Sequence, residues 1–469
     1  MVRSNSAGPG DPHTGQDAPL AGLLRRLAVV VGLLSLACNN STDMRGLREP
    51  VHQVRPAAAE SSVPAGPLKT DPGRRAAAPG SRTSDEKGSI EYVLLVSVDG
   101  LAPRFVGELT RAGDLPTFRH LQQMGAWTHN ARTDVTFTVT LPNHTSMLTG
   151  RPVTAVEGLP ATTHHGITYN ALPAVTDTVH NIGNPSLSYV ASVMDVVHDH
   201  GGRTCFFASK DKFILFEQSY DAHAGAPDRV GEDNGRDKID VLKVTNQETG
   251  SLIDTVTRVI TNHPCTFTFL HISDTDSPAG HGQGWGSPQW LDVLRQVDDW
   301  LGRVLGAMEA NRGVRHHWAL ILTADHGGKG YNHQNSLDPL NYVIPFYVMG
   351  PDVPRGVDLY SAVADTRYDP GTTQPLYTDP HPPIRNGDAG NLALELLGLP
   401  YIPGSLMRGM FRKQKGARRS RCGADRLACL DFRSLALELR ARPRRLGRHD
   451  LDAARSCHDP ATCRMMLSP

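Results

Sequence analysis

Three largely apolar runs recur along the chain, namely YVLLVSV at 92–98, TFTFLHI at 266–272 and WALILTA at 318–324. Strands that are apolar at nearly every position are typical of a parallel sheet buried on both faces. The stretches 289–310 and 387–398 instead have the amphipathic pattern of helices that cover such a sheet. The pattern therefore predicts an α/β fold, a three-layer sandwich around a mostly parallel central sheet.

The segments outside this pattern differ in composition. Residues 39–88 are rich in Ala, Pro, Ser, Gly and Arg, show no apolar period, and are expected to form a disordered linker. The α/β pattern occupies residues 89–408. Residues 409–469 form a basic, cysteine-containing tail, which is either a solvated appendage or a contact surface for anionic lipids or polyanions.

An apolar segment near the N-terminus predicts export. Arg25 and Arg26 precede LAVVVGLLSLAC, which ends at Cys38 and is too short to span a bilayer. Residues 1–38 are therefore expected to be a signal peptide, and the protein to be periplasmic or secreted. LSLAC also resembles a bacterial lipobox, apart from Ser35 where leucine is usual. A lipidated Cys38 would attach the protein to a membrane as a cell-surface lipoprotein.

Charge and cysteine content add two constraints. A formal net charge of zero and 39% hydrophobic residues fit a globular protein and do not indicate nucleic acid as an obligatory partner. Besides Cys38 the chain has six cysteines, and an even number in an exported protein favours disulfides. Cys205 and Cys265 each lie at an apparent strand and are either disulfide-bonded or free buried thiols. The oligomeric state is not indicated.

Carboxylate and imidazole side chains follow each of the three apolar runs. Asp99 follows the first run, whereas Asp276 and His281 follow the second. Asp325 and His326 follow the third. A single aspartate after a strand is commonly a helix cap or turn residue. Because sites in parallel sheets form beyond the carboxyl ends of the strands, three such sets predict one functional site.

This set of side chains predicts metal ions. Mixed carboxylate and imidazole ligands suit Zn²⁺ better than Mg²⁺, and Mn²⁺ or another divalent cation is the alternative. With one further histidine the set offers six ligands, which is too many for one tetrahedral ion. Two ions about 3.5–4 Å apart would stabilise both the attacking and the leaving oxygen of an in-line displacement.

The segment TVTLPNHTSMLTG at 138–150 supplies the candidate nucleophile. Proline favours the first helical turn, so Thr140, two residues before Pro142, is expected at or just before a helix N-cap. Free backbone N–H groups there would attract a phosphate, whereas Thr145 and Ser146 would lie further along the helix. A metal-coordinated hydroxyl needs no neighbouring base. A plain N-cap is the competing interpretation of Thr140.

These residues carry a family resemblance. The motifs VSVDG, TLPNHTSMLTG, HHGITYN, DTDSPAGH and LTADHGG, in this order, resemble the alkaline phosphatase superfamily. The branch that the chain most resembles is that of nucleotide pyrophosphatase/phosphodiesterases and their bacterial relatives, over roughly residues 91–408. The resemblance implies an alkaline phosphatase-like catalytic domain at 89–408. It also implies hydrolysis of small-molecule phosphoric diesters, pyrophosphates or monoesters with two Zn²⁺ and a covalent phosphothreonine.

Carried over motif by motif, the resemblance assigns individual roles. Thr140 is the expected nucleophile, and Asn170 in HHGITYN is the expected phosphate-binding amide. The implied ligands of one zinc ion are Asp99, Asp325, His326 and the Thr140 oxygen, and those of the other are Asp276, His281 and a last histidine, assigned to His333.

Two departures from the family pattern leave alternatives. The family usually has four residues from aspartate to histidine in Asp-x-x-Gly-His, whereas Asp276 and His281 are five apart. Asp274 is therefore the alternative to Asp276. The last histidine normally follows an inserted segment, which makes His381 the alternative to His333.

Several further residues have both a functional and a structural interpretation. His144 is expected to orient the start of its helix. Lys210 and Phe213 in SKDKF either contact a substrate or end a strand on a solvated loop, and Trp285 either lines the pocket mouth or packs internally.

Two other functions compete with this one. A sulfate or phosphonate ester hydrolase of the superfamily is one, although Cys205 and Cys265 do not fit the Cys/Ser-x-Pro-x-Arg motif of sulfatases. A catalytically inactive, surface-displayed binding protein of the same fold is the other, and the completeness of the ligand set argues against it.

Overall fold

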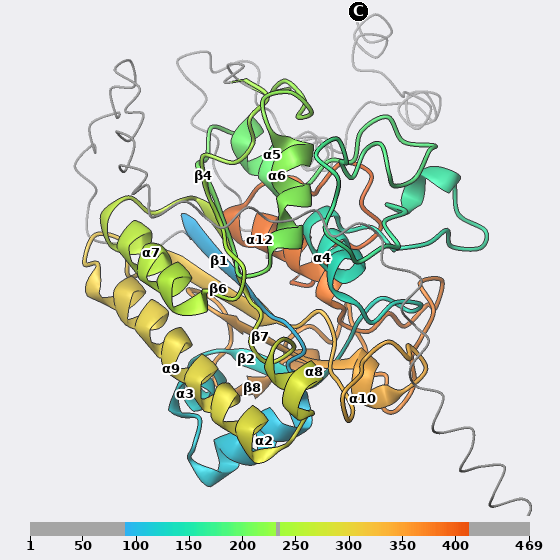
Figure 1. The fold of residues 1–469 in the computed structure, drawn as a ribbon. Coiled ribbons are helices and arrows are strands. Elements are labelled where there is room, and N and C mark those ends of the chain that lie inside the picture. Colours follow the sequence, from blue (N-terminus) through green and yellow to red (C-terminus); the bar gives the residue numbers. More distant parts are fainter. Residues whose placement is uncertain (1–89, 231–234, 412–469) are drawn as a thin grey trace, which may run out of the picture. The chain divides into compact units, whose positions relative to one another are not determined.

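The computed structural model describes residues 90–230 and 235–411 (Figure 1). The predicted signal peptide, the predicted linker and almost all of the basic tail lie outside these ranges, so the interpretations given for them stay predictions. Among the helices of the described ranges, none is both long and apolar enough to cross a membrane.

An eight-stranded sheet with the order β4-β3-β5-β1-β6-β7-β2-β8 forms the centre of the described domain (Figure 1). The first five strands of this order, β4, β3, β5, β1 and β6, are mutually parallel. Strand β7 is antiparallel to both of its neighbours, and β8 is parallel to β2. The bounds are β1 Tyr92–Val98, β2 Ala126–Arg132, β3 Thr204–Ala208, β4 Val241–Val244, β5 Phe267–Ile272, β6 Trp318–Thr323, β7 Val343–Met349 and β8 Val357–Asp358.

The three apolar runs are confirmed as strands and are neighbours in the sheet, in the order β5-β1-β6. All six residues of β5 and of β6 are buried, as are six of the seven residues of β1. Helices cover both faces of a central strand, so each side chain enters an apolar layer whichever way it points. This burial is the physical reason why these segments show little alternation.

Helices form the outer layers on the two sides of the sheet (Figure 1). Helices α2, α3, α7 and α9 pack as one layer, and α4, α5 and α12 as the other. The amphipathic stretches predicted at 289–310 and 387–398 are α9 and α12. The bounds are α2 Pro103–Ala112, α3 Pro116–Met124, α4 Thr140–Thr149, α5 Val193–Asp199, α6 Ile214–Tyr220, α7 Thr249–Asn262, α8 Ala279–Gln283, α9 Pro288–Ala310, α10 Pro339–Tyr342, α11 Leu359–Ala362 and α12 Ala389–Leu397.

A disulfide joins Cys205 of β3 to Cys265, two residues before β5. Both cysteines are fully buried, and their Cα atoms are 5.8 Å apart. The structure thus decides between the bonded and the free interpretation of this pair. Closing a loop across a sequence separation of 60 residues typically stabilises a fold by about 2–4 kcal/mol.

One edge of the sheet collects the loops that carry chemistry. Strands β3, β5, β1 and β6 are parallel, so their carboxyl ends meet there. Strand β7 runs in the opposite direction to β6 and β2. Its first residue and the last residue of β2 therefore lie at the same edge. The segment before β7 therefore lies near the loops that follow the central strands. So does the segment after β2, which contains the start of α4.

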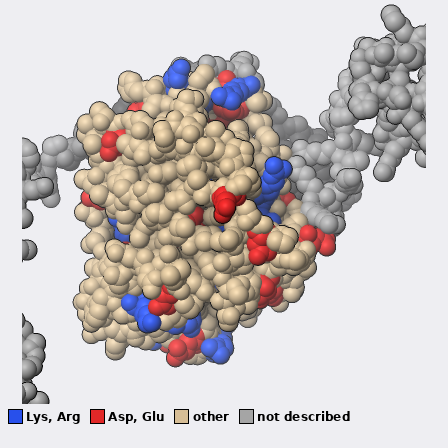
Figure 2. Space-filling view, turned by 90° about the vertical axis from the view of Figure 1, so that its right-hand side faces the viewer, with Lys and Arg blue, Asp and Glu red and all other residues tan. Residues whose placement is uncertain are grey.

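Acidic and basic side chains are interspersed over the face of the domain seen in Figure 2. Most of that face is formed by uncharged residues and histidines, so it presents no block of a single charge. Long-range attraction of a polyanion to this face is therefore not expected from its charge pattern.

Candidate metal centre

Four buried side chains converge beyond the carboxyl ends of the three central strands. Asp99 follows β1, Asp276 lies in the turn after β5, and Asp325 and His326 follow β6. Ligand atoms of Asp99, Asp276 and His326 lie within 4.8 Å of one another. The Nε2 atom of His326 lies 3.2 Å from Oδ2 of Asp325. These four residues are called the inner cluster below.

The inner cluster contains polar atoms that are buried without a hydrogen bond to any described residue. These atoms are Oδ1 of Asp99, Oδ1 of Asp276, Oδ2 of Asp325 and Nε2 of His326. Burying a polar atom without a partner is costly, and a cation bound among four such atoms would remove that cost. Three carboxylate oxygens and one imidazole nitrogen fit a divalent metal ion.

Backbone N–H groups turn the Asp325 carboxylate toward this cluster. Its Oδ1 accepts from Gly100 N–H at 3.1 Å and from His326 N–H at 2.9 Å, which leaves Oδ2 facing His326 Nε2. Gly100 has a φ of +69°, and a Cβ there would lie 3.0 Å from Asp276 and from Trp285. Glycine at this position therefore allows the backbone amide to approach Asp325.

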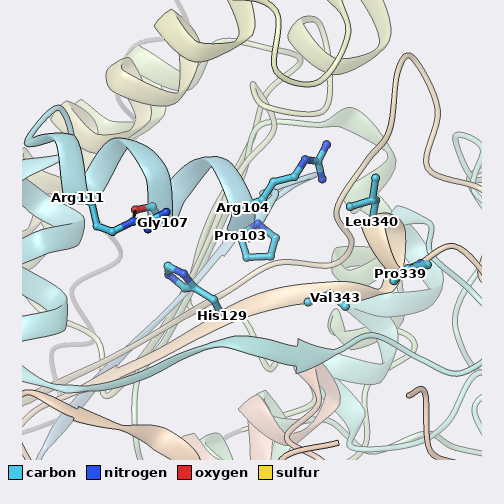
Figure 3. Close-up of a pocket in the computed structure, with 8 residues that line it drawn as sticks. All are labelled: Pro103, Arg104, Gly107, Arg111, His129, Pro339, Leu340 and Val343. Atoms are coloured by element: carbon cyan, nitrogen blue, oxygen red, sulfur yellow. Dashed lines mark hydrogen bonds between the residues drawn. The ribbon is translucent and has the colours of Figure 1, made fainter. Parts of the chain in front are cut away.

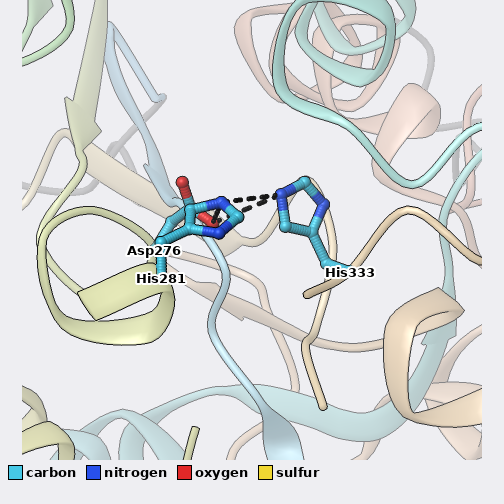
Figure 4. Close-up of side chains that lie close together, drawn as sticks. All are labelled: Asp276, His281 and His333. Carbon is cyan, nitrogen blue, oxygen red and sulfur yellow. Dashed lines mark hydrogen bonds and ion pairs between the residues drawn. The ribbon is translucent and has the colours of Figure 1, made fainter. Parts of the chain in front are cut away.

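A second group of ligands adjoins the first and is called the outer cluster (Figure 4). It consists of Asp276, His281 and His333, whose ligand atoms also lie within 4.8 Å of one another. Oδ1 of Asp276 lies 3.3 Å from His281 Nε2 and 3.5 Å from His333 Nε2. The same Asp276 oxygen faces both clusters, so the structure makes this carboxylate common to the two candidate metal positions.

The three histidines present the same nitrogen to these clusters. Each Nδ1 lies against a backbone carbonyl: His281 against Tyr331 at 3.0 Å, His326 against Gly327 at 2.8 Å, and His333 against Thr138 at 2.5 Å. A carbonyl can only accept, so Nδ1 carries the proton and Nε2 is the free ligand atom. The Nε2 atoms of His281 and His333 are 3.2 Å apart. Two lone pairs at that distance require a proton or a cation between them.

Burial and neighbouring charge raise the pKa of some cluster residues and lower the pKa of others. Burial, with the nearby Asp99, raises the pKa of Asp325 to about 8. Burial acts to lower the pKa of His326, but Asp325 and Asp99 outweigh it and raise that pKa to about 9. Burial and the adjacent His326 lower the pKa of His333 to about 3. A divalent ion at these atoms would take the place of protons that the crowded carboxylates retain.

Lys210, just after β3, contacts both candidate positions. Its Nζ donates to Oδ2 of Asp99 and to Oδ2 of Asp276, each at 2.7 Å. Nε2 of His271 also lies 3.0 Å from Oδ2 of Asp99. Burial acts to lower the pKa of Lys210, but the two carboxylates raise it overall. The sequence singled out Lys210 without a definite role and missed His271, whose only signal is a polar side chain inside an apolar strand.

The candidate nucleophile lies at the start of α4, in a segment whose Thr138 and His144 contact residues of the clusters. Thr140 is buried and is the first helical residue, with the extended Val139 as N-cap, so it lies one position later than the sequence suggested. The Oδ1 atom of Asn170 accepts from Leu141 N–H at 2.9 Å. Asn170, rather than a capping hydroxyl of Thr140, therefore satisfies this free amide, and the plain N-cap interpretation is not supported.

Residues on either side of Thr140 contact the clusters. The carbonyl of Thr138 accepts from His333, and Nδ1 of His144 lies 3.8 Å from Oδ2 of Asp325. His144 also contacts the hydroxyl of Ser97 at 2.7 Å and the carbonyl of Thr140 at 2.8 Å. Both of its nitrogens are thus occupied by groups that hold α4 against β1, which fits the expected structural role of His144.

The structure distinguishes between the alternatives that the spacing left open. Asp274 accepts hydrogen bonds from the hydroxyls of Thr249 and Ser273 and belongs to neither cluster, whereas Asp276 belongs to both. His381 is exposed and packs its ring edge-on against Tyr368. His333 is therefore the histidine that the fold brings to the site. The roles of these residues as metal ligands stay predictions.

Two aromatic residues considered for substrate contact are packed internally. Phe213 is fully buried and lies against the ring of His271 at 4.1 Å between centroids. The indole N–H of Trp285 donates to the carbonyl of Gly100 at 2.8 Å, and a Cβ at Gly280 or Gly328 would collide with its ring. Trp285 therefore packs under the loops that carry the clusters, which favours the structural interpretation.

A separate cavity of about 330 Å³ lies beside α2, away from the clusters (Figure 3). Arg104 at its edge donates to the carbonyl of Gly328 at 2.8 Å, so the cavity borders the loop that follows His326. None of the eight lining residues is a predicted site residue. They are Pro103, Arg104, Gly107, Arg111, His129, Pro339, Leu340 and Val343.

Comparison with known proteins identifies the family. Residues 93–349, more than half of the chain, match the model of the family described as type I phosphodiesterase/nucleotide pyrophosphatase. The chain therefore belongs to this family and is a hydrolase of the phosphodiesterase/pyrophosphatase family. The family is typically metal-dependent and acts on small phosphate esters. A search of curated proteins found no match.

Solved structures resemble the chain more distantly. Murine ectonucleotide pyrophosphatase/phosphodiesterase 5, in an inactive form bound to AMP, is 15% identical; the match covers 67% of this chain and 96% of that chain, with a TM-score of 0.45. The human protein of the same name is 15% identical, with 66% and 96% covered and a TM-score of 0.43. A Vibrio parahaemolyticus protein in the alkaline phosphatase superfamily is 17% identical, with 69% and 70% covered and a TM-score of 0.40. At such TM-scores these matches add no argument about activity.

Proposed function

We propose that the chain hydrolyses phosphoric diesters or pyrophosphates of small molecules through a phosphothreonine formed on Thr140, with two divalent cations, Zn²⁺ being the first candidate. One observation supports this most strongly: among the described residues, four ligand atoms of the inner cluster have no hydrogen-bond partner, and they lie next to an outer cluster whose two histidines direct Nε2 at Asp276. Diesters come before monoesters in this proposal because the family match is to phosphodiesterases.

The residues that would hold the two cations follow from the clusters. The inner position uses Asp99, Asp325 and His326, with the Thr140 oxygen as a further ligand. The outer position uses Asp276, His281 and His333, and the Asp276 carboxylate also faces the inner position. Bound divalent cations would neutralise charge on the phosphoryl oxygens and lower the pKa of the Thr140 hydroxyl.

In this proposal Thr140 and Asn170 act directly on the phosphoryl group. As the Oγ1–P bond of Thr140 forms, the bond from phosphorus to the leaving oxygen breaks, and the substrate alcohol or phosphate departs. Water then cleaves the phosphothreonine and regenerates the hydroxyl. The Oδ1 atom of Asn170 is held by Leu141 N–H, so its Nδ2 amide is the group free to donate to a non-bridging phosphoryl oxygen.

The deciding experiment compares two chromogenic esters, p-nitrophenyl phosphate and the p-nitrophenyl ester of thymidine monophosphate. We expect faster turnover of the diester by the zinc-loaded wild type. Thr140→Ala should lower kcat/KM by at least about a thousandfold, because a covalent step without its nucleophile loses most of its rate. Thr140→Ser is the matched control, since it keeps a hydroxyl at the same position and should keep measurable activity.

The outcome also separates this function from its competitors. A zinc-loaded protein without activity on either ester would refute the phosphodiesterase assignment for these substrates and direct attention to sulfate or phosphonate esters. A protein that binds no divalent cation would favour the inactive binding protein. If Thr140→Ala were as active as wild type, the nucleophile would lie elsewhere.

A further inference from the structure

Lys210 lies in the turn between β3 and the 3₁₀ segment Asp211–Phe213 and is almost fully buried, with 7% of its surface exposed. The preceding residue anchors this turn to β5. The Ser209 hydroxyl donates to the carbonyl of His271 at 3.1 Å and accepts from Ser273 N–H at 2.9 Å. The base of the lysine side chain is therefore fixed relative to the strand that leads to Asp276.

The ammonium of Lys210 and the candidate cation positions use different oxygens of the same carboxylates. Nζ contacts Oδ2 of Asp99 and Oδ2 of Asp276 at 2.7 Å each. The oxygens without a hydrogen-bond partner among the described residues are the two Oδ1 atoms. These Oδ1 atoms lie 3.3 Å and 4.0 Å from Nε2 of His326. The lysine thus holds one oxygen of each carboxylate and leaves the other available.

We propose that Lys210 is a positioning residue that ties together the two carboxylates of adjacent cation sites and so fixes how far apart two bound divalent cations lie. This inference rests on the proposed function. Asp99 belongs to the inner cluster, while Asp276 also belongs to the outer cluster. Two carboxylates this close repel each other, and a single ammonium between their Oδ2 atoms offsets that repulsion and sets both orientations.

Lysine suits this position for a chemical reason. An ammonium has three N–H donors around one point, so it can donate to two carboxylates from different strands at once. A neutral side chain of similar length, such as methionine, could fill the space but could neither donate nor supply the charge. His271 would then be the contact left to Oδ2 of Asp99 among the described residues.

The same turn reaches the segment that carries the predicted phosphate-binding amide. Nζ of Lys212 donates to the backbone carbonyl of Asn170 at 2.8 Å. Lys212 is therefore unsuitable as a neutral control for Lys210. Lys243 of β4 is suitable, because its ammonium contacts Ser251 and Thr255 of α7 and takes no part in either cluster.

The test measures metal binding without turnover. Zn²⁺ is titrated into metal-free wild type, Lys210→Met, Lys210→Arg and Lys243→Met in competition with a chromophoric chelator, and Co²⁺ spectra are recorded for each. We expect Lys210→Met to bind at least one of the two Zn²⁺ about 10–100-fold more weakly and to change the Co²⁺ absorption bands. Lys210→Arg should recover part of the affinity, and Lys243→Met should match wild type.

Each other result has a definite meaning. Tighter Zn²⁺ binding by Lys210→Met would show that the ammonium occupies a cation's own place, and would overturn the positioning role. Unchanged affinity and spectra would do the same, by making the contact a plain ion pair. If Lys210→Met did not fold, Lys210→Arg binding two Zn²⁺ with altered Co²⁺ bands would support the role, and wild-type bands would oppose it. A wild type that binds no Zn²⁺ would overturn the proposed function as well.

Discussion

The two clusters share Asp276 but differ in their exposure to solvent. In the inner cluster the side chains of Asp99, Asp325 and His326 are all 0% exposed. In the outer cluster the His281 side chain is 43% exposed. The inner ligands directly follow β1 and β6, whereas His281 lies in the short helix α8 and His333 in an irregular loop.

This difference in exposure predicts that cations at the two positions exchange at different rates and have different roles. A cation in the inner cluster would be shielded from water, so its charge would be weakly screened and it would exchange slowly. A cation at the outer cluster would meet solvent through His281, exchange faster, and be better placed to contact a leaving group or incoming water. Because Asp276 faces both positions, substitution of this residue should weaken cation binding at both of them.

Among changes to the ligands of the two clusters, the largest effect is expected from Asp276→Asn. Losing the shared carboxylate should weaken binding of both cations and lower kcat/KM for the diester by more than about a hundredfold, a loss beyond that of removing a supporting partner. Asp274→Asn is the matched control, because the Asp274 carboxylate accepts from the hydroxyls of Thr249 and Ser273 and belongs to neither cluster. Zinc content per protein and kcat/KM are the measurements. If Asp274→Asn proved the more damaging variant, the assignment of the shared ligand would be wrong.

A smaller and more selective effect is expected when one histidine of each cluster is removed. His326→Ala should lose the buried cation, and excess Zn²⁺ should not restore activity, because the unpaired carboxylates would take up protons instead. His281→Ala should lose about tenfold in kcat/KM, and excess Zn²⁺ should restore most of it, since water can replace an exposed ligand. Activity across a Zn²⁺ titration checks this. The reverse pattern of rescue would contradict the inner and outer distinction.

The smallest expected effect is on the pH dependence of stability, which limits the pH range in which the clusters can be compared. His165 is fully buried next to the hydroxyl of Ser146 in α4, and burial lowers its pKa to about 3. The folded state therefore favours the neutral ring. The resulting stabilisation is complete above pH 6.5, the ordinary value, and is lost progressively as the pH falls toward 3.

This loss is measurable by urea unfolding between pH 7 and pH 4.5. One extra proton bound by the unfolded chain lowers the free energy of unfolding by at most about 1.4 kcal/mol per pH unit. The plot of the free energy of unfolding against pH should have a smaller slope for His165→Gln than for wild type, by up to this amount. This holds even if the variant is less stable at pH 7. Parallel curves would show that His165 does not titrate on unfolding.

The fold was largely predictable from the apolar pattern. The runs at 92–98, 266–272 and 318–324 became β1, β5 and β6, because central strands of a covered sheet must be apolar on both faces. Strand β4, at the edge of the sheet, has no fully buried residue. The sequence of β4 has no long apolar run, so the apolar pattern did not predict this strand.

The site was predictable in composition but not in arrangement. Asp99, Asp325 and His326 could be placed because they directly follow strongly apolar strands. The choice between Asp274 and Asp276 could not, because both follow β5 and only the turn determines which one faces the cluster. Lys210 carried no distinctive local signal, since its partners lie 111 and 66 residues away in the sequence.

The sequence by itself determined which central strands are buried, which side chains follow them and that a helix begins near Thr140, because these depend on local periodicity and on chain direction. Only the tertiary structure decided that Asp276 is common to two clusters, that His333 and not His381 joins them, and that Lys210 links Asp99 to Asp276. Those contacts follow from the strand order β3-β5-β1-β6-β7. Long-range packing sets that order, and it leaves no repeating pattern in any single segment.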